Sequence, residues 1–121
     1  MGLDMYAFPT AHKLTSEIDF PREDADHQFH YWRKHPNLHG WMENLYRTKG
    51  GVNEFNSTTL QLTSEDIDFL ECVIKEGKLP ETCGFFFGKS DGSECEDDLD
   101  FISNARGALE QGLTVYYSSW W

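Results

Sequence analysis

The chain opens with a short, mainly hydrophobic run of β-prone residues at 3–8, LDMYAF. The odd-numbered positions are apolar and the even-numbered ones begin with Asp4, so the two sets point to opposite faces of an extended chain. The run ends at Pro9 and predicts an opening β-strand. Residues 10–26 are rich in acids and have no sustained period, which predicts a loop with one extended piece at residues 18–20.

A helical period follows. Apolar residues recur at the i, i+3, i+4, i+7 and i+8 spacing of one helical face, namely Leu38, Trp41, Met42, Leu45 and Tyr46. Pro36 suits the first helical position, where its missing N–H needs no partner. The helix is expected to end at residues 48–51, followed by a loop at 52–58 and a short strand at 59–62.

A second helix is predicted from Ser64 to Gly77. Two acids, Glu65 and Asp66, lie in its first turn, where the helix dipole favours negative charge. Its apolar stripe consists of Ile67, Leu70, Val73 and Ile74. Residues 83–88, CGFFFG, then predict an interior strand covered on both faces. The alternative is a strand whose glycines let a ligand approach closely.

A third helix and a closing strand complete the pattern. Ser93 and Glu96 stand three residues apart, as in a capping box. Leu99, Ile102 and Leu109 recur within the helix, Gly112 ends it, and residues 113–121, LTVYYSSWW, predict the last strand. This order is typical of a single α+β domain over residues 1–121, a small sheet of about three to four strands packed by three helices.

Charge is distributed unevenly. The 121 residues include 21 Asp and Glu against 10 Lys and Arg, a formal charge of −11 that repels a phosphate backbone and argues against direct nucleic-acid binding. Residues 27–49, which begin HQFHYWRKHPNLHGW, carry a local +3, so the rest of the chain carries −14. We expect this segment to face an anion, either a ligand or the protein's own acidic surface.

The sequence predicts a soluble, cytoplasmic protein. Its three cysteines, Cys72, Cys83 and Cys95, form no CxxC pair, as in a reducing compartment. The first residues lack the basic and apolar regions of a signal peptide. No segment approaches the ~20 apolar residues that cross a membrane.

The histidines raise the question of a metal site. His27 and His30 are three residues apart, and His35 and His39 are four apart, spacings that align two imidazoles on a helix. Pro36 disfavours that geometry for His35, and no further ligand pair stands at a recognised spacing. The acidic run at residues 91–100 lacks the spacing of a calcium loop. We therefore expect neither a metal nor any other cofactor.

No catalytic motif is present, neither a nucleophile elbow nor a phosphate loop. The enzymatic alternatives are acid–base chemistry by His39 with Asp4, or a Cys83 nucleophile with His39 as its base. We expect a binding protein rather than an enzyme, and assign no catalytic residue.

Aromatic and basic residues are adjacent at positions 31–34. Tyr31 and Trp32 beside Arg33 and Lys34 can stack on a base and hold a phosphate. In the alternative interpretation the aromatic residues belong to the core and the two cations pair with the acids of residues 17–26.

Four stretches in order, MGLDMY, YWRKHPNLHGWM, LP-x-T-x-GFFFG and YYSSWW, resemble a family of small proteins of phages, prophages and bacterial genomes. The resemblance covers nearly the whole chain and implies a context of mobile elements rather than a reaction. Members sometimes carry the label phosphoglycerate kinase, which does not fit a chain this short without a nucleotide loop. The residues that match the motif are Asp4, Tyr31, Trp32, Arg33, Lys34, His39, Trp41 and 116–121.

The motif also suggests a topology. The first and last strands are expected to pair and to bring Asp4 near residues 31–34. We assign Trp41 to core packing, because it lies on the apolar stripe of the first helix.

The leading hypothesis is a small acidic accessory protein of phage type that binds a protein partner. Most concretely, it would inhibit a host defence system that acts on nucleic acid, its acidic surface competing with DNA or RNA for a basic groove. It would bind neither nucleic acid nor membrane directly. The candidate partner- or ligand-binding residues are Asp4, Tyr31, Trp32, Arg33, Lys34 and His39.

Two alternatives remain open. In the first, Trp32, Arg33 and His39 form a pocket that sequesters or hydrolyses a nucleotide or another phosphorylated small molecule. In the second, the domain acts through homo-oligomerisation by Trp120 and Trp121, and its oligomeric state is left open.

Overall fold

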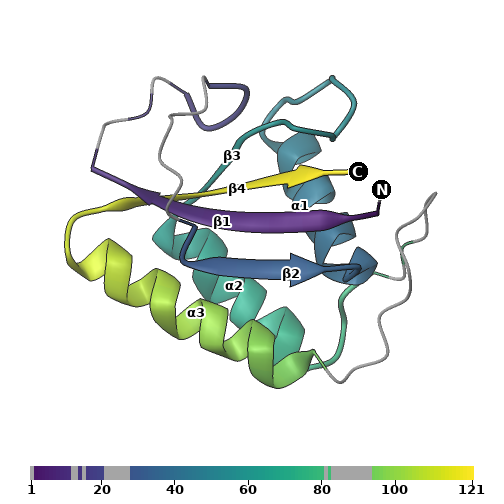
Figure 1. The fold of residues 1–121 in the computed structure, drawn as a ribbon. Helices are drawn as coiled ribbons and strands as arrows, with labels where there is room; N and C mark the ends of the chain where they lie inside the picture. Colours follow the sequence, from purple (N-terminus) through teal and green to yellow (C-terminus); the bar gives the residue numbers. More distant parts are fainter. Residues whose placement is uncertain (1, 12–13, 15, 21–27, 81, 83–93) are drawn as a thin grey trace.

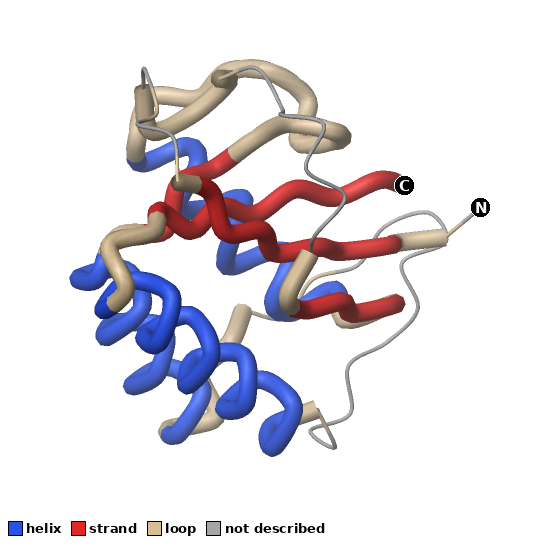
Figure 2. Tube along the Cα trace, turned by 60° about the vertical axis from the view of Figure 1, so that its left-hand side comes forward, coloured by secondary structure: helices blue, strands red, loops and turns tan. Residues whose placement is uncertain are grey.

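A computed structural model describes residues 2–11, 14, 16–20, 28–80, 82 and 94–121. In this part the sheet has four antiparallel strands in the order β2-β1-β4-β3. The strands are β1 (Asp4–Thr10), β2 (His30–Arg33), β3 (Leu60–Leu62) and β4 (Thr114–Trp120). The helices α1 (Pro36–Thr48), α2 (Ser64–Lys75) and α3 (Cys95–Glu110) pack on one face of the sheet (Figures 1 and 2). The predicted α+β fold is confirmed.

The first and last strands pair along their whole length at the centre of the sheet. The register runs from Asp4 opposite Trp120 to Thr10 opposite Thr114, which confirms the predicted pairing. The first strand also continues through Pro9, where the sequence predicted its end. The main-chain N–H and C=O groups of the odd-numbered residues of β1 point toward β2. Because β2 pairs with β1 only as far as Ala7, the N–H that Pro9 lacks would have no partner in β2.

Strand β2 was not predicted. Its four residues, His30 to Arg33, form an edge strand, although the sequence indicated only a basic entry to the first helix. A strand this short alternates too briefly to be recognised from its pattern. The predicted strand at 83–88, and with it Cys83, lies outside the described residues, as do His27 and Ser93.

Helices α1 and α2 begin where the pattern predicted, whereas α3 begins at Cys95, after Glu94 and not directly after the predicted cap Ser93. Pro36 is the first residue of α1, and Trp41 lies in the core with 7% of its surface exposed. At α2 a capping box forms one residue before Ser64: Asp66 N–H donates to Thr63 Oγ1 at 3.2 Å, and Thr63 N–H donates to Asp66 Oδ2 at 3.0 Å. Residue Glu94 precedes α3 without a side-chain cap.

The two faces of the sheet are covered differently. The helices bury the face that carries Met5, Ala7 and Trp32. On the outer face a smaller cluster forms around Phe8, Phe20 and Tyr116. Residues 17–19 also bond to β3, and Ile18 forms a bridge with Leu60, which confirms an extended residue at Ile18. Asp19 has a φ of 54°, so the expected extended piece does not continue through it. Among the residues that the structure describes, neither of these clusters extends over the outer face beside β2.

Candidate functional site

The six predicted binding residues divide between the two faces of the sheet. Successive side chains of a strand point to opposite faces, so Trp32 lies among the core residues while Tyr31 and Arg33 lie on the outer face with Asp4. His39 is buried in α1, on the helix side. The expected pocket of Trp32, Arg33 and His39 is therefore wrong, because the sheet itself separates Arg33 from the other two.

On the helix side, Trp32 joins a buried polar cluster with His35 and Asp98. The Trp32 indole N–H donates to Asp98 Oδ1 at 3.0 Å, and His35 Nε2 donates to Asp98 Oδ2 at 2.8 Å. Asp98 is 1% exposed and His35 3% exposed. Two N–H donors thus satisfy a carboxylate that is otherwise cut off from water, and they tie β2 and the start of α1 to the first turn of α3.

Sequence reasoning missed this cluster. It treated Asp98 as one of several acids at a helix N-terminus and His35 as half of a doubtful metal pair. A signal was present: Asp98 stands three, four and seven residues before Phe101, Ile102 and Ala105, all buried, so it lies on the apolar face of α3. An acid on that face requires a buried partner.

A cavity of about 400 Å³ lies beside the cluster. Its polar wall includes His35, Asn37, Glu94 and Asp98, and its apolar wall includes Ile74 and Leu79. His35 Nδ1 lies 3.7 Å from a Glu94 carboxylate oxygen, so the imidazole sits between two acids. The structural effect of this arrangement is to hold the N-termini of α1 and α3 together.

His39 is not available for the predicted acid–base pair with Asp4. Its Nδ1 shares a 2.7 Å hydrogen bond with the Tyr117 hydroxyl inside the core. Burial lowers the pKa of His39 to about 4, and burial raises the pKa of Tyr117 well above its ordinary value. Both groups are therefore neutral at pH 7. Asp4, on the far side of the sheet, makes its contacts with Tyr31 and Arg33.

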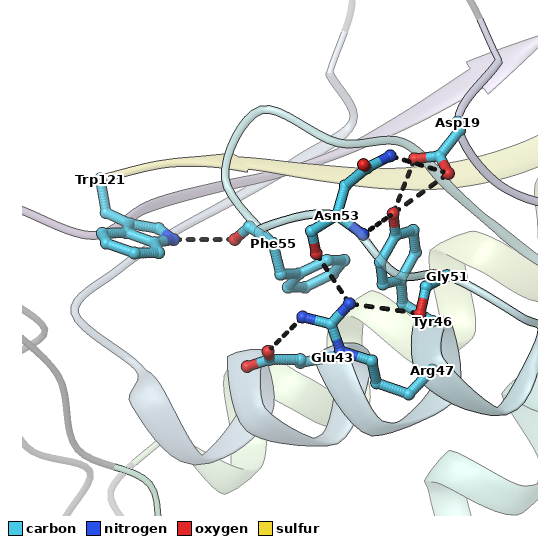
Figure 3. Close-up of polar contacts among 8 residues, drawn as sticks. All are labelled: Asp19, Glu43, Tyr46, Arg47, Gly51, Asn53, Phe55 and Trp121. Carbon is cyan, nitrogen blue, oxygen red and sulfur yellow. Dashed lines mark hydrogen bonds and ion pairs between the residues drawn. The ribbon is translucent and has the colours of Figure 1, made fainter.

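Two of the four cations of residues 27–49, Arg47 and Lys49, donate hydrogen bonds within the protein. Lys49 Nζ lies 2.7 Å from Asp66 Oδ2 and 3.4 Å from Glu17 Oε1, with only 9% of its side chain exposed. Arg47 donates to Glu43 and to the carbonyls of Gly51 and Asn53 (Figure 3). Part of the local positive charge thus faces the protein's own acids and loop carbonyls.

Figure 3 also shows what this bonding holds in place. The Tyr46 hydroxyl donates to Asp19, and the Trp121 indole N–H donates to Phe55 O at 2.8 Å. The loop at 50–57 and the last residue are thereby fixed to α1. Trp121 is thus held by its own chain, whereas its neighbour Trp120 is 66% exposed.

The other two cations, Arg33 and Lys34, are exposed at the end of the edge strand β2. The Tyr31 hydroxyl donates to Asp4 Oδ1 at 2.7 Å, and this bond raises the pKa of Tyr31 to about 12. Arg33 Nε lies 3.9 Å from the same carboxylate. We call Asp4, Tyr31, Arg33 and Lys34 the edge patch.

The predicted partners of these cations were the acids of residues 17–26. Among the described residues the ion-pair partner of Arg33 is Asp4. Three of the predicted acids, Glu23, Asp24 and Asp26, lie outside the described residues. Of the predicted acids that the structure describes, Glu17 bonds to Lys49 and Asp19 to Tyr46, both on the β3 side of the sheet.

Neither a metal cluster nor a membrane span is found in the part of the chain that the structure describes. No three His, Cys, Asp or Glu side chains there group as metal ligands, and His30 instead bonds to Asp97 at 3.0 Å. No described helix is both long and apolar enough to cross a bilayer. Comparison with known proteins finds no matching family model, curated protein or solved structure. A function for this chain therefore rests on its own residues and geometry.

Proposed function

We propose that this protein acts by binding a basic protein partner, and most concretely that it inhibits a host defence system that acts on nucleic acid. The observation that carries the proposal is the negative charge of helices α2 and α3. Helices α2 and α3 lie side by side and together carry nine acidic side chains against two basic ones. The acids are Glu65, Asp66, Asp68, Glu71, Glu96, Asp97, Asp98, Asp100 and Glu110, and the bases are Lys75 and Arg106.

Some of these acids are already neutralised within the protein. Arg106 pairs with Asp68 and Glu71 across the two helices, and Asp98 is buried. The remaining exposed carboxylates include Glu65, Glu96, Asp100 and Glu110. Glu96 and Asp100 stand four residues apart, about 6 Å along the helix axis, so they present a row of negative charge to solvent.

Such a surface suits a groove that normally holds nucleic acid. Basic grooves gain affinity by contacting successive phosphates, and a row of carboxylates offers the same sign of charge at similar separations. Attraction of this kind speeds association and weakens as salt rises. The resemblance to phage and prophage proteins supplies a context in which inhibiting a host nuclease is useful.

The test is competition for nucleic acid at low salt. A panel of defence nucleases would be mixed with labelled DNA or RNA, and binding followed by fluorescence anisotropy as the protein is added. The test variant is Glu96→Gln with Asp100→Asn. Its matched control, Glu17→Gln with Glu54→Gln, removes the same charge away from α2 and α3.

Displacement by the wild type and the control, but not by the test variant, supports the proposal. It is rejected if no nuclease loses its nucleic acid at about 50 mM salt, where such contacts are strongest. It is equally rejected if both variants displace nucleic acid equally well, since the effect would then follow net charge alone.

The geometry gives less support to the small-molecule alternative. A phosphate-binding pocket of Trp32, Arg33 and His39 would need side chains that the sheet holds on opposite faces. The oligomerisation alternative rests on Trp120 alone, since Trp121 bonds to its own chain through Phe55 O and Asn56.

A further inference from the structure

The outer edge of β2 has no neighbouring strand within the part of the chain that the structure describes. The opposite edge of the sheet, at β3, is covered by residues 17–19. There Asp19 N–H donates to Thr59 O at 3.1 Å, and Gln61 N–H donates to Glu17 O at 2.7 Å. Within the described residues one edge of the sheet is therefore covered and the other is open, and an open edge is where a further strand can add.

Main-chain N–H and C=O groups point outward from the open edge of β2. Lys34 N–H donates to Leu3 O at 2.8 Å, so the even-numbered residues among 30–34 direct their main-chain N–H and C=O groups toward β1. In an antiparallel ladder alternate residues face opposite neighbours. Tyr31 and Arg33 therefore direct their N–H and C=O groups away from the sheet, enough for about four hydrogen bonds to an added strand.

The charge of this edge selects the kind of strand. The Arg33 side chain is 58% exposed and is held by Asp4 only at 3.9 Å. Lys34 is exposed, and no carboxylate of the described residues lies within ion-pair distance of it. Two cations at the end of an edge strand repel a basic segment and attract an acidic one.

The backbone of Lys34 adds an independent observation. Its φ is 55°, in the left-handed region that glycine or asparagine occupies at lower cost. The Lys34 side chain is exposed, so core packing of that side chain does not hold the residue in this conformation. Residues held in strained conformations concentrate where the side chain serves binding.

We propose that the outer edge of β2 is a docking site for an extended acidic segment of a partner protein. The segment adds as a strand beside Tyr31 and Arg33, and its carboxylates contact Arg33 and Lys34. The exposed Tyr31 ring, at 45%, provides an apolar surface for the side chain opposite it. This site is separate from the acidic face of α2 and α3, so either surface can function without the other.

The test uses a defined probe, a fluorescein-labelled peptide of ten residues in which Glu and Thr alternate. One control peptide carries Lys in place of Glu, and another is N-methylated at alternate residues, which keeps its charge but removes main-chain donors. The protein variants are Arg33→Gln with Lys34→Gln, and a matched control, Lys75→Gln with Lys78→Gln, which removes two exposed cations elsewhere. All four substituted side chains are exposed, and circular dichroism checks that both variants fold.

We expect the wild type and the Lys75/Lys78 control to bind the Glu peptide alike. The Arg33/Lys34 variant should bind about tenfold more weakly, as for the loss of two exposed ion pairs. The Lys peptide should not bind, and the N-methylated peptide should lose about tenfold, because strand addition needs its N–H groups. Binding should also slow hydrogen exchange at the amides of Tyr31 and Arg33.

Three results would overturn the proposal. The first is no binding of the Glu peptide at about 1 mM in low salt, weaker than any specific site of this kind. The second is binding without protection of the Tyr31 and Arg33 amides, or equal binding of the N-methylated peptide, which would leave only electrostatic attraction. The third is a dimer in light scattering whose formation blocks the peptide, which would make a second copy of the chain the occupant.

Discussion

Replacing Asp98 by Asn tests the buried cluster that joins β2, α1 and α3. The substitution keeps the shape of the side chain but removes its charge and one of its two acceptor atoms. An amide oxygen can accept from the Trp32 indole or from His35, not from both. If the NH2 group faces His35, a bond is kept only when the imidazole carries its proton on Nδ1, and that bond is no longer charge-assisted. The substitution therefore breaks or weakens one bond of a buried charged pair without opening a cavity.

The expected cost follows from these contacts. A hydrogen bond to a charged group contributes about 1.5–3 kcal/mol, and an unsatisfied buried donor costs about 1–3 kcal/mol. Measured losses for breaking buried pairs are about 3–5 kcal/mol. We expect Asp98→Asn to lower the free energy of unfolding by about 3 kcal/mol, and the melting temperature by about 10 °C.

Urea unfolding followed by tryptophan fluorescence measures this loss, and the adjacent acid provides the control. Asp97 also bonds to a histidine, His30, but its side chain is 54% exposed. Asp97→Asn makes the same change of charge in the same helical turn and should cost at most about 1 kcal/mol. Equal midpoints for the two variants would refute the reasoning. So would simple additivity of Asp98→Asn and Trp32→Phe, because residues that share a network are expected to couple.

Three further predictions concern titration and backbone strain. The pKa of His39 is about 4 in the folded protein and about 6.5 in the unfolded chain. The stability that neutral His39 contributes is therefore fully present above pH 6.5 and is lost as pH falls toward 4, by about 3 kcal/mol. His39→Phe should flatten the fall of the urea midpoint over this pH range, and an unchanged slope would contradict the prediction. Asp4→Asn should return the pKa of Tyr31 from about 12 toward 10, as read by ultraviolet titration, because the carboxylate that holds the phenolic proton is gone. Lys34→Gly should raise the free energy of unfolding by about 1 kcal/mol through relief of its left-handed backbone; a lower urea midpoint at unchanged m would show that the lysine is not strained.

Local pattern alone located every helix of the described chain. The first residue of α1 at Pro36 and of α2 at Ser64 follow from cap and dipole preferences that act within a few residues. The β-prone run at residues 3–8 likewise marked β1, and the β-branched and aromatic end marked β4. Periodicity and caps depend on neighbouring residues, so one sequence is enough to reveal them.

The sequence by itself also determined that the protein is acidic, and that its positive charge concentrates in residues 27–49. The sequence could not say which of those cations bond within the protein and which stay exposed to solvent. Tertiary structure decided that, by bringing Asp66 to Lys49 and loop carbonyls to Arg47 while leaving Arg33 and Lys34 exposed. An ion pair depends on which distant segments meet, and no local pattern encodes that meeting.

The same reason explains the division of the candidate site. Whether residues 31–34 enter a helix or form an edge strand depends on pairing with β1, more than twenty residues away, and that pairing alone set Trp32 toward the core and Arg33 toward solvent. The partner of Asp98, His35, lies 63 positions earlier in the chain. Residue chemistry singled out the aromatic and basic segment, and only the folded sheet decided which of its side chains are exposed.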